Sequence, residues 1–169
     1  EGDVVRIATD ASSDTVFKGS MCFVAGNGDY RLRTRETKAS TDELELEALT
    51  LALKYLLKVG ARKAVIESDS VAALEAVEQI VHKRGSKASR LGRTWRGVSS
   101  GARSRFQQAW GDIQGQCEVD IRRVLGHAGD PLNRAADQIA YMGLRAIAHP
   151  MKQSRETLRE GIQKALSAL

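Results

Sequence analysis

Cysteine, proline and aromatic residues are all scarce in this chain. Its 169 residues include only 2 cysteines and 2 prolines, and 5% of them are aromatic. Cys22 and Cys117 stand far apart, with neither a CxxC pair nor a Cys/His cluster around them. The sequence therefore supports neither a disulfide framework nor a zinc site. We expect both cysteines to be buried as small hydrophobic residues.

Long apolar runs are also missing. No segment approaches the roughly 20 apolar residues that a membrane-spanning helix needs, and no charged start followed by an apolar block resembles a signal peptide. Hydrophobic residues make up 42% of the chain and charged residues 28%, which is typical of a soluble globular protein. We expect a monomeric, cytoplasmic protein with one main domain and no membrane partner.

Acidic residues are absent from one stretch, between Gln79 and Gly111. The same stretch contains eight basic residues, namely Lys83, Arg84, Lys87, Arg90, Arg93, Arg96, Arg103 and Arg105. The net charge is +5 overall, so the remainder of the chain sums to −3. A basic block of this kind suits a polyanion, because each neutralised phosphate releases condensed counterions. A solvated basic loop is the alternative.

Three strands are predicted in the first part of the chain, over residues 4–9, 17–25 and 30–38. The first ends at a cluster of turn formers that begins with Asp10, and residues 26–29 form a hairpin turn between the other two. Successive strands with short connections favour antiparallel pairing. Asp10 is therefore expected at the end of a strand.

Helices and strands alternate in the rest of the chain. Residues 40–43 have the S-x-x-E form of a capping box, ahead of a helix over 44–59. A strand over 64–69 ends in a second aspartate, Asp69. The other predicted elements are a helix over 70–82, a loop over 85–101, a helix over 104–114, a strand over 119–125, a turn-rich loop over 126–131, a helix over 133–148 and an amphipathic tail over 154–169.

We summarise the predicted order as βββαβαβα followed by one extra helix. It favours an α/β fold with a mixed five-stranded sheet, three antiparallel strands followed by parallel additions, flanked by helices. Ligand sites in such sheets collect where strand ends open into a crevice. Asp10 and Asp69 are expected at that edge.

Several carboxylates from separate elements could converge at that edge, and Asp10 and Asp69 are the two that the strand pattern places there. Hydrolysis of a phosphodiester by water needs charge neutralisation at the attacking and leaving oxygens, which two divalent cations can supply. Magnesium prefers oxygen ligands and keeps part of its water. An aspartate at a strand end can also be merely a helix cap, so the combination of acids carries the prediction.

Four motifs of the chain resemble those of type 1 ribonuclease H, in that family's order. They are I-A-T-D-A-S at 7–12, E-L-E-A-L at 45–49, E-S-D-S at 67–70, and G-H-A-G-D-P at 126–131 followed by Asp137. The last is the most specific, because His127 and Asp137 stand ten residues apart across a glycine-flanked loop that runs into a helix. The resemblance spans about residues 4–148. It implies a ribonuclease H domain over 1–150 and a C-terminal helix over 151–169.

The resemblance also implies roles. Asp10 would bridge two Mg²⁺ ions, for which Mn²⁺ could substitute, and Asp69 would help to position the attacking water. Glu45 would bind the ion nearer the leaving group, and Asp137 would complete the other site. His127 would assist product departure or proton transfer, a task that its ordinary pKa of about 6.5 suits; a surface histidine without a role is the alternative.

The helical glutamate requires a choice among Glu43, Glu45 and Glu47. Residues two apart point to different faces of a helix, so only one of them is expected to face the site. Aligning the apolar positions Ala52 and Leu53 with the family pattern selects Glu45. Glu47 is the fallback.

The substrate-binding loops depart from the family pattern. The segment after Asp10 is short and has no glycine before Gly19, and Thr41 and Asp42 replace a pair of asparagines. Ser12, Thr41 and Ser70 are the expected hydrogen-bonding groups for sugar or phosphate.

In the basic block, Arg93, Trp95 and Arg96 are expected to bind the DNA strand, with the indole on a sugar and the guanidiniums on phosphates. The alternative is that Trp95 is a hydrophobic residue packed under the loop. Trp110 is expected in the core.

The predicted function is endonucleolytic hydrolysis of the RNA strand of RNA/DNA hybrids by two metal ions, leaving 5′-phosphate and 3′-hydroxyl ends. One alternative is a related domain that acts as a DNA exonuclease or strand transferase, against which the G-H-A-G motif argues. The other is a non-catalytic hybrid-binding module, which would have no need of four mutually repelling carboxylates.

Overall fold

The computed structural model describes residues 2–14, 17–82, 98–126, 129–150 and 154–169. Their elements run β1 (Val5–Ser13), β2 (Gly19–Ala25), β3 (Tyr30–Arg35), α1 (Thr41–Val59), β4 (Lys63–Ser68), α2 (Val71–His82), α4 (Ser100–Ile113), β5 (Glu118–Arg123), α5 (Pro131–Ala148) and α6 (Arg155–Leu166). Two described helices, α2 and α4, connect β4 to β5, where the summary order βββαβαβα counts only one.

A single mixed sheet with the strand order β3-β2-β1-β4-β5 forms the centre of the molecule. The pairs β1–β2 and β2–β3 are antiparallel, and β1–β4 and β4–β5 are parallel. The parallel pairs need long crossovers, which the helices supply. The mixed five-stranded sheet flanked by helices confirms the predicted fold class, with β1 at its centre.

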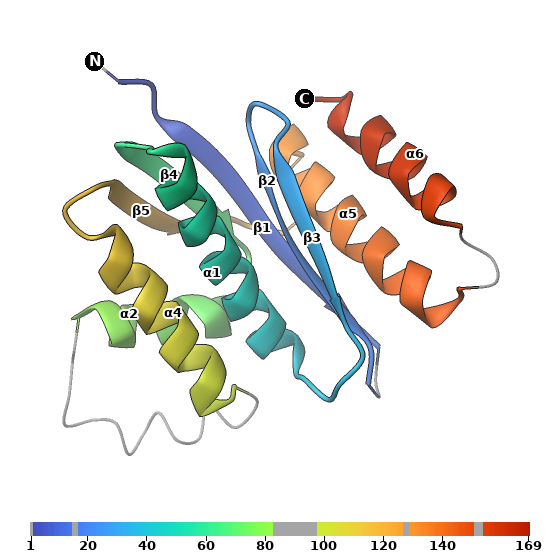
Figure 1. Ribbon diagram of the computed structural model, residues 1–169, viewed down its shortest axis with the longest axis horizontal. Helices are drawn as coiled ribbons and strands as arrows, with labels where there is room; N and C mark the ends of the chain where they lie inside the picture. The colour runs from blue at the N-terminus through green and yellow to red at the C-terminus, as the bar shows by residue number, and fades with distance from the viewer. Residues whose placement is uncertain (1, 15–16, 83–97, 127–128, 151–153) are drawn as a thin grey trace.

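Two hydrophobic cores lie on opposite faces of this sheet. Figure 1 shows α1, α2 and α4 on one side of the strands and α5 and α6 on the other. Side chains alternate between the faces along β1: Ile7 packs in the core with α1, and Ala8 packs in the core with α5. Both faces of the central strands are therefore buried.

The first strand is longer than predicted. It continues to Ser13 and pairs with β2 as far as Gly19, so Asp10 lies within β1 and opposite Cys22. The turn formers after Thr9 do not end the strand, because hydrogen bonds to β2 outweigh their weak local preference. The prediction that Asp10 stands at a strand end was wrong.

Three helices begin earlier than predicted. The helix expected over 44–59 begins at Thr41, directly after its N-cap Ser40. The helix expected over 104–114 begins at Ser100, because the hydroxyl of Ser99 accepts a hydrogen bond from the backbone N–H of Ala102. The helix expected over 133–148 begins at Pro131, the position at which proline is favoured. The third strand ends at Arg35 and not at residue 38.

The C-terminal helix α6 packs against α5 through buried Ile162 and Ala165.

Three further residues lie where the sequence predicted them. Cys22 and Cys117 are buried free thiols. Trp110 is partly buried beside Phe106, with ring centroids 6.2 Å apart, which agrees with the predicted core position. Among the helices of the described residues, none is long and apolar enough to cross a membrane.

Candidate active site

Asp10 lies where two strands part. Pairing of β1 with β4 ends at Ala8 opposite Glu67, whereas pairing with β2 continues to Ser13. The flank of β1 beyond Ala8 is therefore open to side chains from other elements. One oxygen of the Asp10 carboxylate accepts a hydrogen bond from the backbone N–H of Ala11, at 2.9 Å.

Asp69 follows directly after β4, and the end of that strand is tied on two sides. The Thr9 hydroxyl donates to the carbonyl of Glu67 at 3.2 Å, and the backbone N–H of Val124 donates to the carbonyl of Ser68 at 3.0 Å. Ser68 is fully buried. The backbone that carries Asp69 is thus fixed between β1 and the segment after β5.

The three glutamates at the start of α1 point to three different partners. Glu43 accepts hydrogen bonds from the Arg35 guanidinium and from the backbone N–H of Ser99, at 3.0 and 2.7 Å. Glu47 forms an ion pair with Arg105. Glu45 faces Asp10 and Asp69. The structure thus places Glu45 at the cluster and gives Glu47 a different partner.

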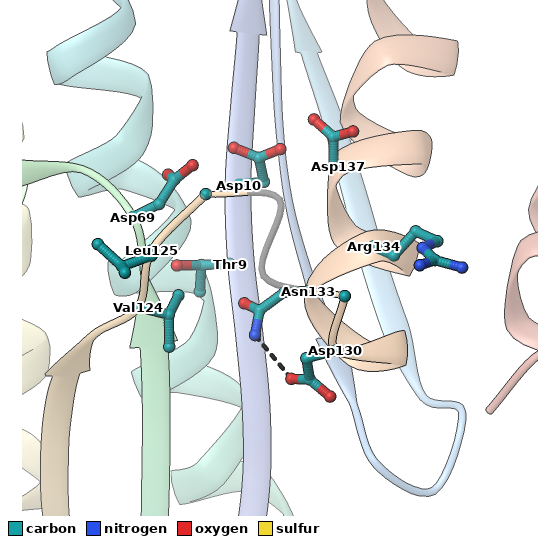
Figure 2. Close-up of a pocket in the computed structure, with 11 residues that line it drawn as sticks. Thr9, Asp10, Asp69, Val124, Leu125, Asp130, Asn133, Arg134 and Asp137 are labelled. Atoms are coloured by element: carbon teal, nitrogen blue, oxygen red, sulfur yellow. Dashed lines mark hydrogen bonds between the residues drawn. The ribbon is translucent and has the colours of Figure 1, made fainter.

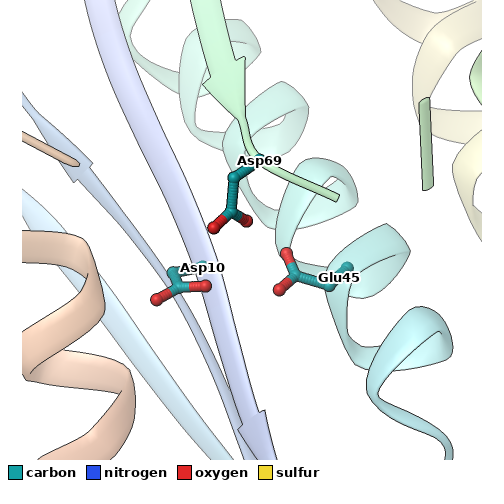
Figure 3. A group of neighbouring side chains, drawn as sticks. All are labelled: Asp10, Glu45 and Asp69. Carbon is teal, nitrogen blue, oxygen red and sulfur yellow. The ribbon is translucent and has the colours of Figure 1, made fainter. Parts of the chain in front are cut away.

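Asp10, Glu45 and Asp69 form one cluster of acids (Figure 3). Each offers a carboxylate oxygen, and these three atoms all lie within 4.8 Å of one another. Glu45 is only 5% exposed, and its Oε2 atom is buried without a hydrogen-bond partner among the described residues. A buried carboxylate oxygen without a partner is costly unless something positive satisfies it. Three hard oxygen donors around one point fit a divalent cation.

The mutual repulsion of these acids appears in their pKa values. Burial raises the pKa of Asp10 from 3.8 to about 7, with the charges of Asp69 and Asp137 adding to the effect and the Ala11 N–H opposing it. Burial, reinforced by Asp10 and Asp69, raises the pKa of Glu45 well above its usual value. Without a cation, the cluster resists full ionisation. Such shifts are frequent at catalytic and metal sites.

Asp137 on α5 faces the same site from the other side of Asp10. A pocket of about 280 Å³ is bordered by Asp10, Asp69 and Asp137 (Figure 2). Asp137 adds to the upward shift of the Asp10 pKa both by its charge and by a side-chain hydrogen bond. The structure therefore brings all four predicted carboxylates to one place, three as a tight cluster and Asp137 across the pocket.

A paired polar network stands next to this cluster. The Arg6 guanidinium donates to both oxygens of Glu67, at 3.0 to 3.3 Å, and also contacts Asp130 at the start of α5. The Asn133 amide donates to Glu67 at 3.0 Å. Figure 2 shows its second hydrogen bond, to Asp130 at 2.7 Å. The network joins β1, β4 and the first turn of α5. It fixes the helix that carries Asp137.

Gly126, in the segment after β5, lies close to Asp69. A Cβ atom at Gly126 would lie 3.1 Å from Oδ2 of Asp69, so a side chain there would push on that carboxylate. Gly129 has φ +78°, a conformation that disfavours other residues. The predicted catalytic His127 lies between these glycines, outside the described residues.

The predicted nucleic-acid contacts fall into two groups. Ser12 lies in β1 opposite Ser20, and the Thr41 hydroxyl is 2.6 Å from that of Ser13, so the end of β1 and the start of α1 adjoin. The Ser70 hydroxyl accepts a hydrogen bond from Ala73 N–H at the start of α2. Arg93, Trp95 and Arg96 lie outside the described residues.

Sequence reasoning missed the paired network of Arg6, Glu67, Asp130 and Asn133. Its members lie up to 127 residues apart in the sequence, so no local pattern links them. Asn133 carried the best available signal, because it stands between the G-H-A-G-D-P motif and Asp137. Leu125 was missed too; it borders the pocket and is 72% exposed.

Comparison with known proteins gives one family. The family model described as RNase H matches residues 2–145. A search of curated proteins finds no match. The matched range begins before β1 and ends inside α5, so it covers the sheet, the acidic cluster and Asp137, and it leaves out α6.

Proposed function

The chain belongs to the ribonuclease H family and is therefore an endoribonuclease, and from that premise we propose that it hydrolyses the RNA strand of RNA/DNA hybrids at the acidic cluster. Two divalent cations, Mg²⁺ or Mn²⁺, would be held by Asp10, Glu45, Asp69 and Asp137. The products would carry 5′-phosphate and 3′-hydroxyl ends.

The observation that carries this proposal is the unsatisfied Glu45 carboxylate. Its Oε2 is buried without a hydrogen-bond partner among the described residues, and one carboxylate oxygen each from Asp10, Glu45 and Asp69 lie within 4.8 Å of one another. Such a group of acids destabilises the folded chain unless a cation binds, because each charge raises the cost of the next. Neighbouring acids such as Glu43 and Glu47 have cationic partners from the protein. The cluster is thus suited to an external cation.

When bound, divalent cations supply charge neutralisation at the attacking and leaving oxygens of a phosphodiester. Asp10, between the other three acids, would be the shared ligand. Asp69, the exposed member of the cluster, would hold the attacking water by hydrogen bonding. Glu45 would serve the leaving-group side and Asp137 the opposite side. His127 would move a proton to or from the departing product.

Substrate contacts are proposed on both sides of this centre. Ser12 and Thr41 would bond to sugar or phosphate from adjoining elements, and Ser70 from the start of α2. Arg93, Trp95 and Arg96 would hold the DNA strand. We further propose that the chain acts as a monomer in the cytoplasm.

Cleavage of four matched substrates tests the proposal: a labelled RNA annealed to DNA, the same RNA alone, the same RNA annealed to RNA, and duplex DNA. Only the hybrid should be cut, and only with Mg²⁺ or Mn²⁺ present. Treatment of the products with phosphatase, followed by electrophoresis, identifies the 5′ ends. Comparable cutting of duplex DNA would favour a DNA nuclease, and tight hybrid binding without cutting would favour a binding module.

A pair of variants provides the control. Asp69→Asn should abolish cleavage while leaving the fold intact. Asp120→Asn changes an exposed aspartate on β5 that pairs with Arg122, and it should cut the hybrid at the parent rate. Equal activity of the two variants would remove Asp69 from the mechanism.

A further inference from the structure

One face of α5 carries a row of exposed side chains that continues away from the acidic cluster. From its second turn onward, its exposed residues are Arg134, Asp137, Gln138, Tyr141 and Arg145. The spacing of three or four residues keeps them on one side of the helix. The buried residues between them, such as Ile139 and Ala140, face the sheet core. We call these five exposed residues the α5 stripe.

An aromatic ring and a guanidinium occupy the far part of the α5 stripe. Tyr141 is 53% exposed, and the guanidinium carbon of Arg145 lies 5.7 Å from the centre of its ring. The contact holds the charge and the ring together at the surface. An exposed ring beside a guanidinium is a favourable surface for a sugar or base together with a phosphate.

The α5 stripe is continuous with the catalytic pocket. Arg134 and Asp137 border that pocket (Figure 2), and Tyr141 follows Asp137 by one turn. With a rise of 1.5 Å per residue, Tyr141 lies about 6 Å and Arg145 about 12 Å beyond Asp137 along the helix axis. That span matches about three nucleotides of a strand at 3.4 Å each.

The far end of the α5 stripe is held next to the strand pair that carries Asp10. The Lys18 ammonium, at the start of β2, donates to the carbonyl of Ile147 at 3.1 Å. Ser12 and Ser13 lie at the adjacent end of β1. A strand of nucleic acid that leaves the pocket along α5 would therefore run beside Lys18 and the end of β1.

We propose that the α5 stripe binds the RNA strand of the hybrid next to the cleaved phosphate, with Tyr141 packed on a ribose or base and Arg145 on a phosphate. The proposal rests on the proposed function, since it takes the pocket as the place where the RNA strand is cut. Charge complementarity and continuity with the pocket select this occupant. Asp137 is the acidic residue of the α5 stripe, and it faces the catalytic pocket.

Binding of a fluorescent RNA/DNA hybrid tests the surface directly. In an Asp10→Asn background, which prevents cleavage, Tyr141→Ala should raise the dissociation constant about five- to tenfold, and Tyr141→Phe should restore it to within about twofold. Arg145→Ala should weaken binding and lower the slope of log K against log salt by about one. Tyr141→Ala should leave that slope unchanged.

Matched controls come from the opposite end of the sheet. Tyr30→Ala removes an exposed ring where β3 begins, opposite Val24, and Arg62→Ala removes an exposed charge just before β4. Both should bind the hybrid like the parent, and thermal melts of all variants should agree within a few degrees. If Tyr141→Ala and Arg145→Ala bind as tightly as these controls, the α5 stripe is not part of the interface.

Neutral methylphosphonates identify the strand. A methylphosphonate at one RNA position near the cut site should weaken binding by the parent but cause no further loss with Arg145→Ala. The same pattern from a DNA-strand position would overturn the RNA assignment. Absence of hybrid cleavage by the unmodified chain would instead contradict the proposed function, and the binding measurements would still decide on the α5 stripe.

Discussion

Glu67 and Asp69 stand two residues apart at the end of β4, and their carboxylates have opposite surroundings. Glu67 accepts hydrogen bonds from the guanidinium of Arg6 and the amide of Asn133. Asp69 faces two further acids, Asp10 and Glu45. One strand end therefore brings one acid to a network that supplies a guanidinium and an amide donor, and the next acid to a cluster of carboxylates.

The first strand shows the same division. Arg6 belongs to the paired network and Asp10, four residues later, to the acidic cluster. Removing the cation that pairs with a buried acid destabilises the fold, because it leaves an uncompensated buried charge. Repelling acids are better tolerated when protonated or when bound to a cation. We infer that the paired network contributes to stability, and that the acidic cluster lowers stability when its acids are ionised and no cation is bound.

The largest expected effect is on catalysis by the acidic cluster. Asp10→Asn should lower the hybrid-cleavage rate about a thousandfold or more, because the proposed shared ligand loses its charge at the centre of the site. Single-turnover cleavage at saturating Mg²⁺ measures this. A loss smaller than tenfold would contradict the central position given to Asp10.

Two glutamates of α1 test the difference between an acid in the cluster and an acid paired with an arginine. Glu45→Gln should reduce cleavage about a hundredfold, since it removes the charge of a proposed cation ligand. Glu47→Gln should change it less than about threefold, because Glu47 pairs with a half-exposed Arg105. Calorimetric titration with Mg²⁺ should show weakened binding for the first variant alone. The reverse order would make Glu47 the ligand.

The free energy of unfolding should fall as the pH rises through the pKa of Asp10, whereas an acid paired with a cation makes it rise with pH. The folded chain raises the pKa of Asp10 from 3.8 to about 7, so it binds that proton more tightly than the unfolded chain does. The stabilising contribution of this proton is full below about pH 4 and is lost as the pH rises through 7. In EDTA, Asp10→Asn should therefore stabilise the chain at pH 8, relative to pH 5, by roughly 2–3 kcal/mol.

Urea unfolding of the parent and of Asp10→Asn at both pH values measures this difference. Addition of Mg²⁺ at pH 8 should restore stability to the parent and have less effect on the variant, because the cation replaces the proton. If the parent instead gained stability relative to the variant between pH 5 and pH 8, the result would contradict the raised pKa of Asp10.

The smallest expected effect concerns the paired network. Arg6→Ala leaves Glu67 without its guanidinium, at a side chain that is only 12% exposed, and should lower the free energy of unfolding by roughly 1–2 kcal/mol. Lys63→Ala breaks the exposed pair with Glu118 and should change it by less than about 0.5 kcal/mol. Equal effects of the two changes would deny the network its stabilising role.

Sequence patterns predicted the helices and strands better than the residues at which they begin and end. Alternating and helical periodicities report which face of an element is buried, so each described strand and helix has a predicted counterpart. These periodicities do not show which strands pair with each other in the sheet. Asp10 lies inside β1 because β2 continues beside it while β4 departs, a long-range fact that the turn formers after Thr9 could not reveal.

The candidate site was predictable to a similar degree. The strand pattern predicted Asp10 and Asp69 at one edge of the sheet, and the resemblance to type 1 ribonuclease H added Asp137 and selected Glu45 over Glu47. The structure brings these four acids together, and their roles stay predictions. The Arg6 network was out of reach, because ion pairs between residues 6, 67 and 130 depend on the assembled sheet. Proline at the first helical position was a readable signal for the true start of α5.

Cys22 lies opposite Asp10 in the β1–β2 ladder, and its thiol is fully buried. The sulfur packs under α5 and donates to the carbonyl of Ala136, so a reagent reaches it when α5 moves away from the sheet. The rate at which Cys22 reacts, compared in a Cys117→Ser chain with and without Mg²⁺ or hybrid, would therefore time the separation of α5, which carries Asp137, from the strand that carries Asp10. The chain thus contains an internal probe of how firmly bound ligands hold α5 against the sheet.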